Sequence, residues 1–191
     1  MMKKILAPPI ILLIISIVFT LNMFGGIETS YVIEPAELNA LEDREYYYAI
    51  IDDINGAEDE ILIAMYIMIY DPDDPEDWAN DLINAIINAS RRGVTVKVII
   101  EYRTYWDTLD ENLEAFKYLR EHGVDVKLDN DTETDHYKLI IIDGKTVYIG
   151  SHNWSESGLY YNREVSIRIV DEGIARELKE YFHQLWQSLT A

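Results

Sequence analysis

DHYKLIIIDGKTVYIGSHNWSESGLYYNRE, residues 135–164, holds most of the recognisable chemistry of this 191-residue chain, and the rest of the fold is expected to form around it. Its segment 139–142 is apolar at every position, which is typical of a strand covered on both faces inside a central sheet. Asp143-Gly144 is a strong signal for a two-residue hairpin turn, and 145–149 is expected to be the returning strand. The stretch therefore predicts a buried β-hairpin.

The polar residues of this hairpin gather at one of its ends. Because side chains alternate between the two faces of a strand, His136 and Lys138 are expected to point in the same direction. The returning strand brings Ser151 and Asn153 back beside them, while His152 points the other way. One patch then holds an imidazole, a fixed cation, a hydroxyl and an amide, which are the groups needed to hold and attack a phosphate.

These polar positions occur in a recognisable order and spacing, His136-x-Lys138-x4-Asp143-x6-Gly150-Ser151-x-Asn153, with Glu164 eleven residues later. The pattern resembles the HKD signature of the phospholipase D superfamily. It is most similar to the small members with a single motif, which are bacterial endonucleases and mitochondrial-surface relatives. The resemblance implies an α/β fold, a layered α/β/α sandwich with a mixed, largely parallel central sheet.

The resemblance also implies a phosphodiesterase that needs neither a metal nor another cofactor, and it supplies a role for each residue. His136 would attack phosphorus and become a phosphohistidine, while Lys138 and Asn153 bind the nonbridging oxygens. Ser151 would assist this network. Glu164 would bond the far nitrogen of His136 and fix its tautomer.

Two further candidates are less firmly tied to the phosphate. Asp143 belongs to the signature and is a candidate catalytic residue, but it is equally well explained as the first residue of the turn before Gly144. Arg163 is a candidate substrate-binding residue, because a basic groove built from Arg163, Arg103 or Lys145 would suit a nucleic acid.

One chain carries one such motif, whereas the implied mechanism needs two histidines on opposite sides of phosphorus. His152 is a poor second histidine because alternation turns it away from Ser151 and Asn153. The economical solution is a homodimer in which two copies of His136 face each other across a single shared site.

The N-terminal segment is expected to meet a membrane. Residues 5–24 carry no charge, and twenty helical residues span about 30 Å, the thickness of a bilayer's hydrocarbon core. We interpret 1–27 as a membrane anchor or signal segment and 28–191 as the phosphodiesterase domain. The absence of a convincing cleavage site before Gly25-Gly26 favours an anchor. Lys3 and Lys4 precede the apolar run, which predicts a domain outside the cytoplasm, either anchored or secreted.

The charge of the chain bears on its substrate. The net charge is −19, and since Lys3 and Lys4 are the only charges before Glu28, the remainder carries −21. Nucleic-acid-binding surfaces usually carry a basic excess. At about 0.15 M salt, however, exposed charges more than about 8 Å apart are largely screened. Three functions stay open: a nuclease acting on DNA or RNA, a phospholipid hydrolase acting on the bilayer beside its anchor, and a catalytically silent adaptor.

Alternating strands and helices are expected around the hairpin, which favours parallel pairing in a layered fold. The expected strands are 30–33, 61–70, 94–100, 124–128 and 164–170, and the expected helices are 41–55, 78–92, 109–122 and 172–189. The acidic segment 71–77 is expected to be a solvated loop that caps the next helix, in preference to a metal site. Aromatic residues in 102–106 are candidates for stacking on bases or dipping into lipid headgroups. Cys is absent, which excludes a disulfide framework and a thiolate zinc site.

Overall fold

The structure is a computed structural model of the chain, and it describes residues 37–102, 110–129 and 134–189. Its elements in chain order are β1 (Glu37–Glu42), α2 (Glu45–Gly56), β2 (Glu60–Met65), α3 (Trp78–Arg92), β3 (Thr95–Ile100), α4 (Asp110–Glu121), β4 (Asp125–Leu128), β5 (Lys138–Ile142), β6 (Thr146–Gly150), η3 (Ser157–Tyr161), β7 (Val165–Val170) and α5 (Glu172–Ser188).

Several expectations fall outside these ranges. The strand at 30–33, the apolar segment 5–24 and the boundary between 27 and 28 lie outside the described residues, as do most of the aromatic positions in 102–106. Within the described ranges, no helix is both long enough and apolar enough to cross a bilayer.

A seven-stranded mixed sheet in the order β1-β7-β6-β5-β2-β3-β4 forms the centre of the fold. The β2–β3 and β3–β4 pairs are parallel, whereas the other four pairs between described strands are antiparallel. The prediction of a mixed sheet is confirmed, but the prediction of a largely parallel sheet is wrong. The alternation of strand and helix ends at β4, and a connection as short as the three residues between β5 and β6 can only join antiparallel strands.

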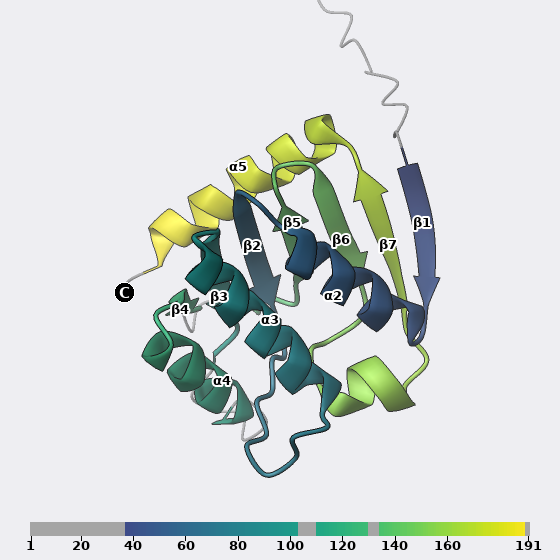
Figure 1. Ribbon diagram of the computed structural model, residues 1–191. Coiled ribbons are helices and arrows are strands. Elements are labelled where there is room, and N and C mark those ends of the chain that lie inside the picture. Colours follow the sequence, from purple (N-terminus) through teal and green to yellow (C-terminus); the bar gives the residue numbers. More distant parts are fainter. Residues whose placement is uncertain (1–36, 103–109, 130–133, 190–191) are drawn as a thin grey trace, which may run out of the picture. The chain divides into compact units, whose positions relative to one another are not determined.

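Helices cover both faces of the sheet, as expected for an α/β/α sandwich. Figure 1 shows α2, α3 and α4 on one face and α5 on the other. The strand β2 contributes to both layers, because Ile61 and Ile63 pack into the cluster with α2 and α3, while Leu62 and Ala64 pack into the cluster with α5. This double burial explains why a central strand is apolar at consecutive positions.

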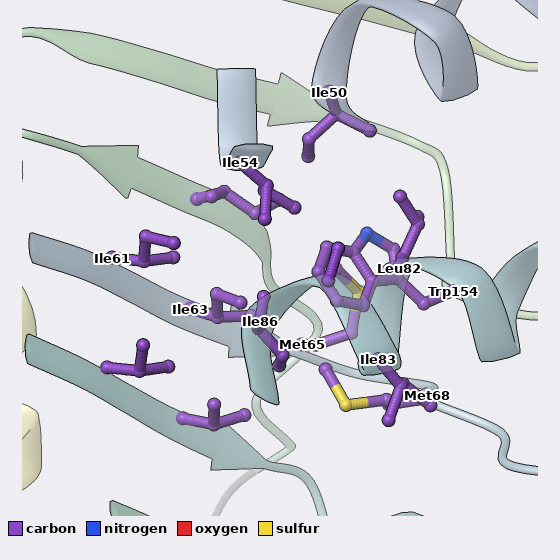
Figure 2. Close-up of a cluster of buried hydrophobic side chains, with 14 of the residues drawn as sticks. Ile50, Ile54, Ile61, Ile63, Met65, Met68, Leu82, Ile83, Ile86 and Trp154 are labelled. Carbon is purple, nitrogen blue, oxygen red and sulfur yellow. The ribbon is translucent and has the colours of Figure 1, made fainter. Parts of the chain in front are cut away.

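The larger cluster also holds Trp154, the residue directly after Asn153. Figure 2 shows the indole of Trp154 among the apolar side chains of α2, α3 and β2. Trp154 is fully buried, and its Nε1 donates to the hydroxyl of Tyr46 at 3.1 Å. The core therefore fixes the position of the chain on either side of this residue.

The beginning of the described fold differs from the expectation. The predicted helix 41–55 starts only at Glu45, because residues 37–42 form the edge strand β1, which pairs with β7 from the far end of the chain. The β1 sequence, ELNALE, is largely polar and mostly exposed, so it carries no signal of a buried strand. Its place in the sheet depends on a partner more than 120 residues away.

The acidic segment before α3 behaves as the sequence indicated. The Asp77 carboxylate accepts a hydrogen bond from the backbone N–H of Ala79 at 2.8 Å and caps the helix. Gly93 ends the helix with a φ of 99°, a left-handed conformation that glycine adopts without strain.

Candidate active site

The predicted site forms at the edge of the sheet where β2 and β3 end. The register pairs Met65 at the end of β2 with Lys138 at the start of β5, and Gly150 at the end of β6 with Ser166 in β7. Segments that leave or enter five strands therefore meet at one edge. In α/β sheets this is the edge where ligands bind.

His136 and Lys138 are in direct contact, which confirms the shared direction that strand alternation predicted. The Nζ atom of Lys138 lies 3.1 Å from each ring nitrogen of His136 and 3.3 Å from its carbonyl oxygen. Lys138 is buried, whereas His136 is exposed to solvent. The imidazole thus has a fixed cation on one side and access to a substrate on the other.

The environment favours the neutral form of both groups. Burial, followed by the charge of Lys138, lowers the pKa of His136, while the charge of Glu101 opposes this shift. Burial lowers the pKa of Lys138 to about 8, and the charge of Glu164 opposes it. A neutral imidazole has a free lone pair, which is the form that can attack phosphorus.

Glu101 and Tyr66 belong to this group, although sequence reasoning missed both. The ring of Tyr66 lies 4.3 Å from the ring of His136 and 4.7 Å from Nζ of Lys138. Glu101 is fully buried, and its carboxylate accepts a hydrogen bond from the backbone N–H of Asp135. The signal for Glu101 was present in the sequence, because it is an acid that directly follows the apolar strand β3. Tyr66 has no comparable signal.

Asn112 of α4 holds these two residues in place. Its Oδ1 accepts from the N–H of Met68 at 2.9 Å, and its Nδ2 donates to the carbonyls of Tyr66 and Glu101 at 2.8 Å each. Asn112 is fully buried. One amide therefore ties the segments after β2 and β3 together, directly beneath the site.

Asn153 follows β6 at the same edge of the sheet. Its Oδ1 atom is buried without a hydrogen-bond partner among the described residues. A buried polar atom without a partner costs about 1–3 kcal/mol, so it persists where the surrounding structure enforces it. The next residue supplies that constraint, because the N–H of Trp154 donates to the carbonyl of Ile67 and its indole is locked in the core.

Ser151 and Glu164 lie at the junction of β6 and β7. The hydroxyl of Ser151 donates to the carbonyl of Val165 at 3.2 Å and accepts from its N–H at 3.0 Å. The Glu164 carboxylate accepts from Nδ2 of Asn162 at 3.1 Å, and no hydrogen bond joins it to His136 among the described residues. In this structure the charge of Glu164 acts on Lys138, and the carboxylate whose charge acts on His136 is that of Glu101.

Gly150 permits the close approach of these two strands. A Cβ atom at this position would collide with the backbone and hydroxyl of Ser166 and with the carbonyl of Val165. The glycine of the motif is therefore required by packing between β6 and β7.

His152 faces the core, as the alternation predicted. It is fully buried and stacks on Tyr46 with ring centroids 4.3 Å apart. Its Nε2 donates to the carbonyl of Asp43 at 2.8 Å, so its Nδ1 accepts from the hydroxyl of Ser166 at 2.7 Å. Both ring nitrogens are occupied within the protein, and this excludes His152 as the second catalytic histidine.

Asp143 lies at the opposite end of β5 from Lys138, away from the group around His136. Its carboxylate accepts hydrogen bonds from the backbone N–H groups of Glu58, Asp59 and Glu60 at 2.8–3.3 Å. Burial alone would raise the pKa of Asp143, but the three N–H donors lower it below its usual value. Of the two explanations offered for Asp143, the turn residue is the one that the contacts support.

Arg163 is exposed and lies beside Glu164. It lines a cavity of 410 Å³ together with Arg44, Tyr160, Tyr161, Asn162 and three acidic residues, Glu42, Asp43 and Glu45. The structure therefore places Arg163 near the site but among carboxylates. Within the described ranges, no group of three or more His, Asp or Glu residues is arranged to hold a metal ion.

Comparison with known proteins identifies relatives of the chain. Residues 50–186 match the family described as "Cardiolipin synthase, PLD-like domain". The chain is 34% identical over 97 residues to a mitochondrial cardiolipin hydrolase of Canis lupus familiaris, which covers 51% of this chain and 37% of the relative. It is 32% identical over 140 residues to a phospholipase D of Rickettsia prowazekii (strain Madrid E), which covers 73% of this chain and 60% of the relative. The matched region thus spans well under two thirds of each relative.

A solved structure shares the fold. Nuc of Salmonella typhimurium, described as a phospholipase D family member, superposes with a TM-score of 0.68. The superposition covers 81% of this chain and 96% of Nuc, at 23% sequence identity. At this identity the likeness shows a common fold.

The lowered pKa of Lys138 leads to a prediction for catalysis. Above about pH 8 the free protein loses the Lys138 proton and with it the cation that faces the phosphate, so kcat/KM should fall about tenfold per pH unit. Initial rates on bis(4-nitrophenyl) phosphate between pH 6 and 10 measure this. The Lys145→Arg control should show the same decrease of kcat/KM above about pH 8. Any activity left in Lys138→Arg should not decrease in this way, because a guanidinium stays charged. A flat profile in the unsubstituted protein would contradict the assignment.

Asp143 leads to a prediction for stability. Asparagine tolerates the observed φ of 51° at position 143, so Asp143→Asn leaves the backbone unstrained. The substitution removes the charged carboxylate that accepts hydrogen bonds from three N–H groups, so the free energy of unfolding at pH 7 should drop by about 2 kcal/mol. Because the folded pKa is lowered, this stability is present above about pH 4 and is lost as the pH falls further, so the two proteins should converge at acidic pH.

Urea unfolding at pH 7 and pH 3, with kcat at 15 °C, tests the role of Asp143. Asp125→Asn is the control, since Asp125 forms an exposed pair with Lys97 and its loss should cost less than about 1 kcal/mol. A decrease of kcat by more than about a hundredfold in Asp143→Asn, with stability unchanged, would show that Asp143 has a catalytic role.

Proposed function

The chain belongs to the PLD-like domain family of the phospholipase D superfamily of phosphodiesterases, and on this premise we propose that it is a metal-independent endonuclease that cleaves DNA or RNA. The observation that carries the proposal is the contact between the exposed, neutral imidazole of His136 and the buried ammonium of Lys138. The imidazole is the nucleophile, and the ammonium of Lys138 and the Nδ2 group of Asn153 donate to the phosphoryl oxygens.

The reaction proceeds in two displacements. A ring nitrogen of His136 in its neutral form attacks phosphorus and forms a P–N bond, while the bond from phosphorus to the leaving oxygen breaks and that oxygen takes a proton from a second histidine that starts in its protonated form. Water then attacks phosphorus and breaks the P–N bond, and the second histidine takes the proton from that water. Both histidines end in their starting states.

The openness of the site supports a polymer substrate. His136 is exposed at a sheet edge, so the phosphodiester in the middle of a long chain can reach it without threading through a channel. The negative charge of the whole protein opposes such a substrate only weakly at physiological salt, because exposed charges further apart than a Debye length of about 8 Å are largely screened.

A phospholipid is the second candidate substrate. The relatives named cardiolipin hydrolase and phospholipase D favour it, and so does the excess of acidic residues, which a single lipid phosphate tolerates better than a polyanion does. The apolar run 5–24 is consistent with action beside a bilayer. We propose that it holds the domain outside the cytoplasm, either as a retained anchor or as a signal for export.

We propose a homodimer with one shared site. The two displacements need a second histidine, and His152 is excluded by its two internal hydrogen bonds. His122 contacts a backbone carbonyl of α4, and His183 lies on α5 near Asp143, at the opposite end of β5 from the site. The partner's His136 is the remaining source. A two-fold axis beside the site edge would place the two imidazoles on opposite sides of one phosphorus.

An apolar surface next to the site offers a face for this dimer. Leu38, Ile149 and Val165 are 56%, 44% and 55% exposed. Leu38 pairs with Ile169, Ile149 lies two residues after Val147, and Val165 lies four residues before Ile169. Because Val147 and Ile169 pack in the cluster with α5, all three exposed residues lie on the face of the sheet that carries α5. Ile149 precedes Gly150 and Val165 follows Glu164, so these two residues adjoin the site, whereas Leu38 lies on the same face toward the Asp143 end of the sheet.

Substrate choice is tested with the full-length protein and His136→Ala in excess EDTA. Single-stranded DNA, duplex DNA, RNA and cardiolipin vesicles are offered to each. Cleavage of a nucleic acid that is at least about a thousandfold faster than in His136→Ala is the expected result. Cleavage of cardiolipin alone would move the protein to the second candidate, and dependence on added Mg²⁺ would contradict both. Asp125→Asn serves as the control for nonspecific effects of substitution.

The shared site is tested by mixing subunits. When the unsubstituted protein and His136→Ala are refolded together in equal amounts, a site that needs both histidines leaves about a quarter of the activity per total dimer, whereas independent sites leave about half. In a separate measurement, Leu38→Asp should shift the protein to a monomer in light scattering and abolish turnover. A fully active monomer would contradict the dimer.

A further inference from the structure

A cavity outside the site has a composition that the phosphodiesterase chemistry does not use. It encloses 280 Å³ between the segment that leads into α3 and the short helix η3. Three carboxylates and three aromatic side chains line it: Asp74, Glu76, Glu156, Trp78, Tyr160 and Tyr161. None of these six belongs to the group around His136.

The aromatic rings form two successive corners. The planes of Trp78 and Tyr160 meet at 84° with centroids 5.0 Å apart, and those of Tyr160 and Tyr161 meet at 80° with centroids 4.9 Å apart. Tyr47 stacks on Trp78 at 4.2 Å and supports the first wall. Rings set at right angles can present faces and edges to one enclosed group from more than one side.

The cavity is strongly negative. No basic residue is among its six lining residues, and the carboxylates are close enough to act on their neighbours. The charge of Glu156 is the first cause that raises the pKa of Tyr161. Burial first, and then the charges of Glu156, Asp74 and Asp71, raise the pKa of Asp77, the helix-capping acid beside the cavity.

One of these rings already binds a cation within the protein. The guanidinium of Arg44 lies 4.1 Å from the centroid of Tyr160, and its Nε donates to the Tyr160 carbonyl at 3.2 Å. This contact belongs to the neighbouring cavity that Arg44 lines. It occupies one face of the Tyr160 ring and leaves the contacts of Trp78 and Tyr161 with this ring unchanged.

We propose that this cavity binds an alkylated ammonium ion, of which choline is the simplest probe. Aromatic faces attract a cation whose charge is spread over methyl groups and whose hydration is weak, and the carboxylates supply the long-range attraction. A nucleic acid does not fit, because three carboxylates repel its phosphates. A small divalent metal does not fit either, because it needs oxygen ligands that converge, and the lining residues supply no such group in the described chain.

The ammonium group has two possible sources, the headgroup of a zwitterionic lipid or a free organic cation. Both share the chemistry that the cavity recognises. A bilayer rich in phosphatidylcholine presents the group at a surface, whereas free choline enters from solution.

The test titrates the full-length protein with choline chloride by isothermal calorimetry at constant ionic strength, with sodium chloride as the balancing salt. Saturable binding is expected, and it should weaken about tenfold in both Glu156→Gln and Tyr161→Ala. Glu156 and Tyr161 are exposed, so neither change removes a core contact. Tyr48→Ala is the matched control, because Tyr48 is 58% exposed and touches Trp78 without lining the cavity.

Three outcomes would overturn the proposal: no saturation up to about 50 mM choline, an affinity in both cavity variants equal to that of the unsubstituted protein, or the same saturable heat when sodium chloride is titrated in place of choline chloride. Vesicles then separate the two sources. Extra binding to phosphatidylcholine over phosphatidylglycerol that is lost in Tyr161→Ala identifies the lipid headgroup. Choline binding without that difference identifies a free cation. The assay does not use turnover, so its result is independent of the phosphodiesterase proposal.

Discussion

The burial of Lys138 against the ring of His136 is the interaction on which the site depends. An ammonium ion taken out of water is costly unless polar groups and charge surround it. Here the ring nitrogens and carbonyl of His136, the face of Tyr66 and the charge of Glu164 offset that cost. Desolvation of His136 itself and then the charge of Lys138 lower the pKa of the imidazole, so the same arrangement favours a neutral ring and holds a cation beside it.

Two polar contacts hold the strands that carry this pair. At one end of β5, Asp143 accepts three backbone N–H groups from the segment that leads into β2. Near the other end, Asn112 ties the segments that follow β2 and β3. The HKD motif is therefore divided by position: His136 and Lys138 lie in contact at the site edge, where we propose that they face the substrate, whereas Asp143 and Gly150 shape the sheet that presents them.

The acidity of the protein acquires a more specific meaning in the structure. Lys138 is shielded from solvent, and in the proposed mechanism it acts on a phosphate at contact distance, where distant surface charge matters little. The carboxylates near η3 are gathered with aromatic rings instead of being spread evenly. The segment 154–163 joins Asn153 to Glu164. It therefore connects the proposed phosphate-binding site to the acidic and aromatic cavity, for which we propose a cation.

The sequence alone determined the local features. The apolar run and the Asp-Gly turn predicted the hairpin, the two-residue period placed Lys138 beside His136 and turned His152 inward, and Asp77 predicted the start of α3, because side-chain direction and capping depend on neighbours in the chain. Only the tertiary structure decided that β1 pairs with β7, that most pairings are antiparallel, and that Glu101 and Asn112 stand behind the site. These contacts join segments far apart in sequence, and their register is set by how the layers pack, which no local period encodes.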